Sequence, residues 1–207
     1  MAVDWRLDRL DLPTDAVAAL AALLDPAEQA RAARYAQVLH RNRFIVRRAR
    51  LRQWLGEYLN LAPAAVAVAT DAMGKPYVPG WDRHFSTSHS RDTLLMAISP
   101  RPVGCDIEWI DSAFDWRPLA QRLFAAEERA ALGAMADGPG RIAFFHCWAR
   151  KEAFVKAIGL GLSHPLDAFA VTGIAPPRLL RGGEGWEIAA IEVPDHAAAV
   201  VVAAPDL

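Results

Sequence analysis

Residues 144–161, FFHCWARKEAFVKAIGLG, constrain the fold more strongly than any other part of the chain. Their apolar side chains recur at helical spacing and predict a helix over residues 141–158, ended by the glycines that follow. A helix that is apolar over most of its surface must be covered by other elements. Lys151, Glu152 and Lys156 nevertheless lie within it. These charges either lie at a solvated edge of the helix or belong to a site.

Other segments of the 207-residue chain show helical and strand patterns in turn. Helices are predicted over residues 14–24, with Thr14 as N-cap, from Asp25-Pro26 onward, over 37–59 and in part of 115–135. Strands are predicted over residues 3–10, 84–89, 93–99, 103–110, 168–172, 186–192 and 197–203. Both halves run through these elements in a loosely similar order, which indicates two α+β subdomains, residues 1–102 and 103–207, packed together.

Charge and composition exclude several classes of protein. A formal net charge of −1 gives no overall attraction to nucleic acid or to an anionic membrane, so any recognition by charge must be local. Apolar runs such as residues 64–69 and 197–204 are far shorter than the roughly 20 residues of a membrane-spanning helix. The N-terminal residues lack the continuous apolar core of a signal peptide. With only two cysteines, the sequence predicts a soluble, reduced, cytoplasmic protein.

The segment VGCDIEWI, residues 103–110, places two carboxylates on one face of a predicted strand. Side chains alternate along a strand, so Asp106 and Glu108 point to one face, about 7 Å apart, and Ile107 and Trp109 point to the other. If both carboxylates are buried and charged, they repel each other unless a cation lies between them. Mg²⁺ or Mn²⁺ meets this need, because both prefer oxygen ligands. The alternative is that both acids lie on a solvated strand face.

The predicted helix adds further charges to this pair. Trp148, Glu152 and Lys156 are spaced i, i+4, i+8 and therefore share one face of the helix. A solvated ion pair between Glu152 and Lys156 is the simplest alternative. The apolar residues around them leave little helix surface for a wholly solvated face. A carboxylate and an ammonium group from the helix, joined to Asp106 and Glu108 from the strand, would make a metal site suited to phosphoryl chemistry.

Three segments offer anchors for a phosphate-bearing substrate. Residues 41–52, RNRFIVRRARLR, give a helix a strongly basic face, and the planar fork of arginine suits phosphate oxygens. Gly74-Lys75-Pro76 places a lysine on a tight turn, and residues 85–90, FSTSHS, end a strand in hydroxyl groups and an imidazole. Each segment also has an ordinary structural interpretation: a solvated helix face, an exposed turn lysine and a histidine that is satisfied by a core hydrogen bond.

The ordered set GKPYVPG, FSTSHS, VGCDIE and FFHCWARKEAFVKAIGLG resembles the Sfp-type 4′-phosphopantetheinyl transferases over about residues 26–172. The resemblance implies a monomer of two similar α+β subdomains, related by a pseudo-twofold, that holds coenzyme A in the cleft between them. It also implies a Mg²⁺-dependent reaction in which the phosphopantetheine group passes to a serine of an apo acyl or peptidyl carrier protein. Adenosine 3′,5′-bisphosphate is then the second product.

Position by position, the resemblance implies roles for individual residues. The Mg²⁺ ligands correspond to Asp106, Glu108 and Glu152, and the catalytic residues correspond to Glu152, Lys156 and Asp106. The phosphates of coenzyme A are expected at Arg43, Lys75, Ser88, His89, Lys156 and Arg31. Glu28 departs from the basic character that some members show near this position, which puts part of the grip on the 3′-phosphate in doubt. Whether Glu152 serves chiefly as metal ligand or as general base stays open.

Two other functions fit parts of the pattern. A Mg²⁺-dependent nuclease or phosphohydrolase would also use the three acids, and its basic helix would follow a nucleic-acid backbone. A non-catalytic module that binds coenzyme A or a carrier protein would tolerate loss of the acids, yet all three are present. The transferase accounts for more of the sequence, because the FSTSHS and GKP segments have no obvious task in a nuclease. Residues 114–135 are the candidate surface for the carrier protein.

Overall fold

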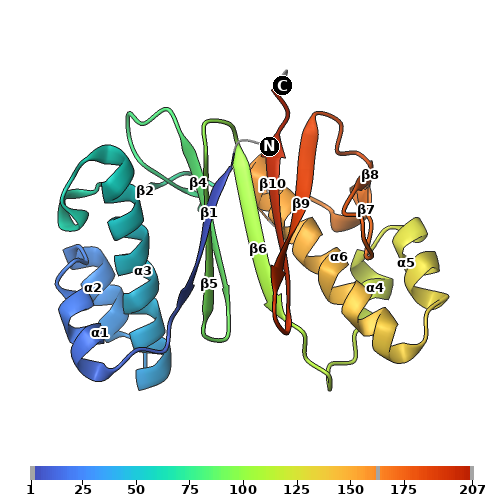
Figure 1. The fold of residues 1–207 in the computed structure, drawn as a ribbon, viewed down its shortest axis with the longest axis horizontal. Coiled ribbons are helices and arrows are strands. Elements are labelled where there is room, and N and C mark those ends of the chain that lie inside the picture. The colour runs from blue at the N-terminus through green and yellow to red at the C-terminus, as the bar shows by residue number, and fades with distance from the viewer. Residues whose placement is uncertain (1–2, 162–163, 206–207) are drawn as a thin grey trace.

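The computed structural model describes residues 3–161 and 164–205, and it places two sheets between two groups of helices (Figure 1). The N-terminal half contains β1 (Asp4–Arg9), α1 (Thr14–Ala21), α2 (Pro26–Ala33), α3 (Val38–Leu59), η1 (Pro63–Ala65), β2 (Ala69–Thr70), β3 (Pro76–Tyr77), β4 (His84–Ser90) and β5 (Thr93–Ser99). The C-terminal half contains β6 (Val103–Trp109), α4 (Arg117–Leu123), α5 (Ala126–Gly133), α6 (Asp137–Ile158), η3 (Leu166–Ala168), β7 (Ala170–Val171), β8 (Leu179–Arg181), β9 (Trp186–Val193) and β10 (His196–Ala203). The fold is α+β, as predicted.

Each half is built on a three-stranded antiparallel sheet and one long helix. The sheets have the strand orders β1-β5-β4 and β6-β10-β9, and the short pairs β2-β3 and β7-β8 lie outside them. Helices α3 and α6 have 22 residues each and cover the outer faces of the two sheets. The pseudo-twofold relation between the halves and the boundary between residues 102 and 103 stay predictions. In the part of the chain that the structure describes, no helix is both long and apolar enough to cross a membrane.

Three apolar clusters hold these layers together. The first joins the helices of the N-terminal half to their sheet, the second joins α4, α5 and α6 to β10, and the third lies between the two sheets. Strand β5 shows how the alternation of a strand serves two clusters at once. Its residues Leu94, Met96 and Ile98 belong to the first cluster, and Leu95 and Ala97 belong to the third. All seven residues of β5 are therefore buried.

Serine hydroxyl groups join β4 to β6 where the two halves meet. Within the described residues these strands belong to separate sheets, so no backbone ladder links them. Ser86 Oγ accepts a hydrogen bond from Cys105 N at 3.1 Å, and Ser90 Oγ accepts one from Trp109 N at 2.9 Å. These bonds satisfy backbone donors that an edge strand leaves without a ladder partner. We call Ser86, Ser88 and Ser90, which alternate along β4, the serine seam.

The contact between β6 and α6 depends on Gly104. A Cβ atom at this position would lie 2.1 Å from the carbonyl oxygen of Ala153 and 2.3 Å from the backbone nitrogen of Ala157. The helix turns small, buried residues toward the strand at this point, including Ala153 and Ala157. Gly104, Asp106 and Glu108 share one strand face, so a helix this close to Gly104 also lies close to both acids.

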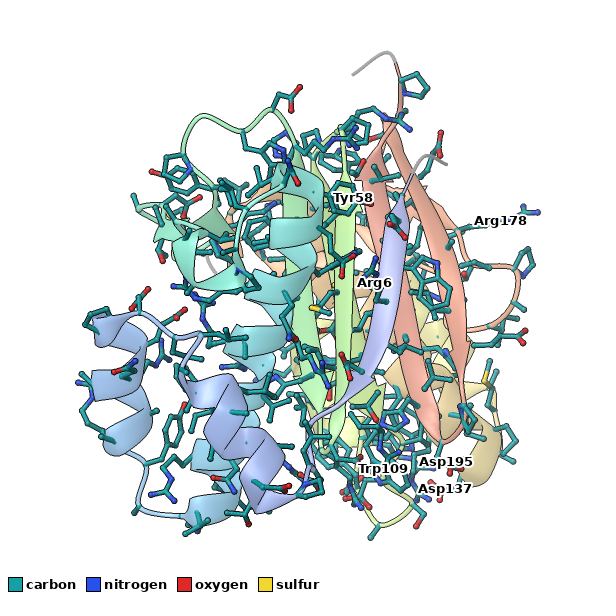
Figure 2. The ribbon with its side chains drawn as sticks, turned by 60° about the vertical axis from the view of Figure 1, so that its left-hand side comes forward. Arg6, Tyr58, Trp109, Asp137, Arg178 and Asp195 are labelled. Atoms are coloured by element: carbon teal, nitrogen blue, oxygen red, sulfur yellow. The ribbon has the colours of Figure 1, made fainter. Side chains whose placement is uncertain are left out.

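The far end of β6 is fixed to the hairpin between β9 and β10. Ile110 N donates a hydrogen bond to the carbonyl oxygen of Asp195 at 2.9 Å. Figure 2 shows Trp109 and Asp195 together at this end of the second sheet. The rings of Trp109 and His196 also meet edge to face, with centroids 5.2 Å apart. This end of the acid-bearing strand is therefore held in place.

The structure differs from the predicted boundaries at several points. Helix α6 begins at Asp137 and not at 141, with two glycines and Pro139 in its first turn. Amide groups of a first turn have no acceptor within the helix, so the missing amide donor of Pro139 costs little there. Thr14 is not the N-cap of α1 but its first residue, and Pro13 precedes it without a side-chain cap. The short strands β2, β3 and β8 were not predicted. The cap at Asp25 is confirmed, since its carboxylate accepts from Glu28 N at 2.8 Å.

We predict that Gly104→Ala destabilises the protein, because the added methyl group meets backbone atoms that cannot move aside alone. Its free energy of unfolding should fall by about 1–3 kcal/mol or more, the usual cost of overpacking. Urea denaturation followed by circular dichroism measures this change. Gly133→Ala, in a helix position with nothing within 4 Å of the new Cβ atom, is the matched control and should not be destabilising. Equal stability of both variants would contradict the close approach.

Candidate active site

Asp106, Lys156 and Ser88 form the centre of the candidate site, where β4, β6 and α6 meet. Lys156 Nζ lies 2.6 Å from Asp106 Oδ1 and donates to Ser88 Oγ at 3.0 Å. Ser88 Oγ in turn donates to Asp106 Oδ1 at 2.6 Å. The three groups come from both halves of the chain, and the serine seam supplies the N-terminal member. The structure thus brings together these three predicted residues.

Burial and charge act in opposite directions on this ion pair. Burial raises the pKa of Asp106, and the nearby ammonium group of Lys156 only partly opposes this. Burial alone would lower the pKa of Lys156, but the charges of Asp106 and other neighbours outweigh it and leave that pKa raised. Lys156 is therefore a cation at neutral pH, held where a negatively charged substrate would need one.

Glu108 lies beside this centre on the same face of β6. Its carboxylate accepts hydrogen bonds from Ser90 Oγ at 3.2 Å and from Trp148 Nε1 at 3.3 Å. Burial, together with the charge of Asp106, raises the pKa of Glu108 to about 7. The carboxylate is therefore only partly ionised at neutral pH, and a cation placed near it would favour the ionised form.

Glu152 lies on α6, one turn before Lys156. Burial, followed by the charge of Asp106, raises its pKa. Two carboxylate oxygens of this region, Asp106 Oδ2 and Glu152 Oε1, are buried without a hydrogen-bond partner among the described residues. Oxygen atoms of this kind are costly to leave unpaired, and they suit a hard divalent cation.

The acids do not form a ready-made metal cage. Across residues 3–161 and 164–205, no three His, Cys, Asp or Glu side chains are grouped so that they could hold a metal ion. The ammonium group of Lys156 occupies one side of Asp106 instead. The chemistry of the donor set, with three acids of raised pKa and two unpaired oxygens, nevertheless fits a divalent cation.

His89 of β4, Arg47 of α3 and Arg31 of α2 form a second group. Arg47 Nη1 lies 3.0 Å from His89 Nε2 and 3.2 Å from His89 Nδ1. Partial burial, with the charges of Arg47, Lys156 and Arg43, lowers the pKa of His89 to about 4. The guanidinium groups of Arg31 and Arg47 lie over the ring of Phe44, 5.4 Å and 5.6 Å from its centroid. Arg47 forms no ion pair within the described residues, so this group carries unbalanced positive charge.

Arg47 is the residue of this group that sequence reasoning missed. Residues 41–52 contain six arginines. Arg43, which was singled out, pairs with both carboxylate oxygens of Asp11, at 2.6 Å and 2.7 Å. Arg47 lies one helical turn later on the same face, and this spacing was the only available signal. Which arginine is left without an acid depends on contacts far apart in the sequence.

Glu28 has a structural task that accounts for its acidic character. It completes the capping box of α2 with Asp25, and its carboxylate pairs with Arg48 and, at 2.8 Å, with Arg52. Arg52 is buried and also donates to the carbonyl oxygen of Val66 at 2.6 Å. Glu28 therefore fixes α2 against α3, and together with Asp25, which also pairs with Arg52, it balances the charges of Arg48 and Arg52.

The other two lysines, Lys75 and Lys151, are bound to groups of the protein itself. Lys75, predicted as a phosphate ligand, donates to the carbonyl oxygens of Val103, Lys156 and Ala157 at 3.3, 2.6 and 3.2 Å. Lys151 is fully buried, lies 2.8 Å from Glu128 Oε1 and ties α5 to α6. The sequence shows three charged residues in the apolar part of this helix. Glu152 and Lys156 lie at the candidate site, and Lys151 lies in the core.

Comparison with known proteins gives this arrangement a family. A sequence model described as the 4′-phosphopantetheinyl transferase superfamily matches residues 102–201, which include β6 and α6. The 4′-phosphopantetheinyl transferase HetI of Nostoc sp. is 32% identical over 207 residues, covering 97% of this chain and 86% of its own. The solved structure of a Thermotoga maritima holo-acyl-carrier-protein synthase overlaps half of the chain at a TM-score of 0.40 and 24% identity, too little to bear on the fold.

Bacillus relatives show similar likeness. The 4′-phosphopantetheinyl transferase psf-1 of Bacillus pumilus is 33% identical over 178 residues, covering 84% of this chain and 70% of its own. The 4′-phosphopantetheinyl transferase Sfp of Bacillus subtilis is 33% identical over 146 residues, covering 70% of this chain and 60% of its own. The site at β4, β6 and α6 thus lies in a chain that belongs to the Sfp-type 4′-phosphopantetheinyl transferases.

Proposed function

We propose that this protein transfers the 4′-phosphopantetheine group of coenzyme A to a serine of an apo acyl or peptidyl carrier protein, with Mg²⁺, and releases adenosine 3′,5′-bisphosphate. The observation that carries the proposal is the ion pair between Lys156 and Asp106, with unpaired carboxylate oxygens beside it, in a chain of this family. A half-buried ammonium group among acids suits a pyrophosphate that is held through a metal ion.

The three acids are the proposed ligands of Mg²⁺. Asp106 and Glu152 each offer an unpaired oxygen, and Glu108 offers a carboxylate that two weak hydrogen bonds hold in place. When bound, the ion would neutralise negative charge on the pyrophosphate oxygens. Because Lys156 already holds one oxygen of Asp106, the ammonium group and the ion would share this carboxylate.

The reaction forms one bond and breaks another at the same phosphorus atom. The serine oxygen of the carrier attacks the β-phosphorus of coenzyme A, and the bond to the bridging oxygen breaks with its electron pair on the leaving bisphosphate. Glu152, directly or through a water molecule, takes the serine proton, and its raised pKa brings it closer to the range of an effective base. Lys156 stabilises the charge that develops on the leaving group.

The phosphates of coenzyme A need further anchors besides Lys156, both cations and neutral hydrogen-bond donors. We assign this task to Ser88, His89 and Arg31 from the sequence motifs, and we add Arg47. The phosphate role of Arg43, whose guanidinium group already pairs with Asp11, stays a prediction. The support for Arg47 is its position against His89 and its lack of an ion pair in the described part of the chain. A phosphate monoester would balance the positive charge of this group. The phosphate role of Lys75 stays a prediction.

The carrier protein, the oligomeric state and the location of the protein complete the proposal. We propose a cytoplasmic monomer that binds no nucleic acid and no membrane. Residues 114–135, which form α4, α5 and their flanking loops, are the proposed carrier surface. Phe114 is partly exposed there, while its ring packs on Phe144 and Phe145 of α6. This segment therefore connects a surface side chain directly to the helix of the site.

The structure favours neither alternative function. A nuclease would need a free basic track on α3, but four of its arginines are paired with carboxylates of the same half: Arg43, Arg48, Arg50 and Arg52. A non-catalytic binding module would leave three acids of raised pKa without a task, and such groups are costly to bury.

We predict that the purified protein modifies an apo carrier protein when coenzyme A and Mg²⁺ are present. Mass spectrometry of the carrier should show a gain of one phosphopantetheine group, and EDTA should prevent it. Glu152→Ala should abolish turnover, because both proposed roles need the carboxylate. No gain with any of several carrier proteins, or full activity of Glu152→Ala, would contradict the proposal.

We predict that Glu108 makes stability depend on pH. Its pKa of about 7 in the folded protein lies above the ordinary value of 4.5, so the folded state holds a proton that the unfolded chain releases. Stability should therefore fall as the pH rises from about 5 to about 8. Melting temperatures in EDTA should show this fall for the wild type and a smaller fall for Glu108→Gln. Parallel curves for the two proteins would show that Glu108 titrates normally.

We predict that Arg47 contributes to coenzyme A affinity through the 3′-phosphate. Arg47→Ala should raise the KM for coenzyme A about tenfold, as expected for a lost charge-assisted hydrogen bond, and should change kcat little. The KM for dephospho-coenzyme A should stay the same. Arg41→Ala, an exposed arginine on the same helix, serves as control and should leave both values unchanged. An equal rise with both substrates would place Arg47 elsewhere.

A further inference from the structure

Lys75 lies on a turn that fixes its direction before any ligand binds. Asp71 Oδ1 accepts hydrogen bonds from Met73 N at 2.9 Å and from Lys75 N at 2.8 Å. Asp71 N donates to the carbonyl oxygen of Lys75 at 2.9 Å, which closes the turn. Gly74 has a φ of 87°, a left-handed conformation that glycine adopts without strain. The turn between β2 and β3 therefore holds the backbone of Lys75 rigidly.

The ammonium group of Lys75 is fully used by three carbonyl oxygens. It donates to Lys156 O at 2.6 Å, to Ala157 O at 3.2 Å and to Val103 O at 3.3 Å. An ammonium group has three N–H donors, so each donor has one acceptor. Partial burial lowers the pKa of Lys75, which agrees with an ammonium group that carbonyl oxygens surround.

The carbonyl groups of Lys156 and Ala157 belong to the last turn of α6, where helical carbonyl groups lack partners within the helix. Gly159 N donates to the carbonyl oxygen of Val155 at 3.1 Å. Lys75 Nζ donates to the carbonyl oxygens of the next two residues, Lys156 and Ala157. A cation at this end also balances the partial negative charge of the helix dipole. Lys75 thus caps α6 from the other half of the chain.

Lys156 is held from two sides as a result. Lys75 binds its carbonyl oxygen at 2.6 Å, while its own ammonium group reaches Asp106 at 2.6 Å and Ser88 at 3.0 Å. We propose that Lys75 is a positioning residue, which fixes the last turn of α6 so that the Lys156 ammonium group stays on Asp106. This inference rests on the proposed function only where it concerns catalytic rate.

The positioning role differs from that of a phosphate ligand in what a mutation would change. A phosphate contact would take a donor from Lys156 O, Ala157 O or Val103 O and leave a carbonyl oxygen without its partner. A positioning residue acts through Lys156, whose charge matters most when the leaving group forms. Its loss should therefore lower kcat, whereas loss of a phosphate ligand should raise the KM for coenzyme A.

The kinetic test uses Lys75→Met, which keeps an unbranched side chain of similar length and removes the three N–H donors of the ammonium group. We expect kcat to fall roughly tenfold, equivalent to about 1.4 kcal/mol, with a KM within about twofold of the wild type. Coenzyme A and dephospho-coenzyme A should be affected equally. A tenfold rise in KM at unchanged kcat, or an effect confined to coenzyme A, would overturn the inference in favour of a phosphate ligand.

A second test does not depend on activity. The chain contains only three lysines, Lys75, Lys151 and Lys156, so protein labelled with ¹³C at the lysine ε-carbon gives three signals. In Lys75→Met, the Lys156 signal should shift, because its ammonium group loses its fixed position. The Lys151 signal should stay, because that ammonium group is held by Glu128 and by two carbonyl groups in the core. An unchanged Lys156 signal would overturn the inference, whether or not the protein proves to be a transferase.

Asp71→Ala provides a second variant that leaves Lys75 in place. Without the Asp71 carboxylate, the turn loses two hydrogen bonds, and Lys75 loses its preset direction. The Lys156 signal should shift in the same direction as in Lys75→Met, by a smaller amount. Asp82→Ala, an exposed residue of the following loop, is the matched control and should leave all three signals unchanged. Agreement between Asp71→Ala and Asp82→Ala would contradict the role of the turn.

Discussion

The close contact between Gly104 and α6 sets the distance on which the rest of the site depends. Because the helix touches the strand at this point, side chains of ordinary length bridge the gap further along, and Lys156 reaches Asp106 at 2.6 Å. A larger residue at position 104 would push the helix away from both acids. Gly104 has no side chain, so the backbones of β6 and α6 are in direct contact. This contact brings the charged groups of Asp106 and Lys156 together.

The serine seam lets the two halves meet without merging into one sheet. A backbone ladder between β4 and β6 would fix the distance between the two strands and would pair the backbone donors of β6 with carbonyl groups of β4. Ser90 Oγ accepts a hydrogen bond from the backbone nitrogen of Trp109 and still donates its own proton to Glu108, and Ser88 donates to Asp106. The strands are therefore joined by groups that also belong to the site.

The sequence predicts the parts of the site that depend on local spacing. Period two along β6 places Asp106 beside Glu108, and the i, i+4 spacing places Glu152 beside Lys156, so these positions follow from secondary structure alone. The tasks of Lys75, Arg47 and Glu28 did not follow, because their partners lie far away in the sequence, as with Lys75 and the carbonyl group of Lys156. No periodicity reports which arginine of α3 has an acid for a partner. The start of α6 was missed because glycine and proline signal a loop yet are tolerated in a first turn.

The order of the strands has a consequence for how the chain folds. In the C-terminal half, β6 is the first strand to be made, and its backbone partner is the last, with Trp109 opposite His196 and Val103 opposite Val202. Every helix of that half must therefore be synthesised before β6 can pair. Contacts between such distant segments form slowly, since a long loop must close first. Strand β6, which carries the acids, is therefore without its backbone partner β10 until the end of synthesis. Until then it can lie only against β4, the edge strand of the first sheet, which is already complete.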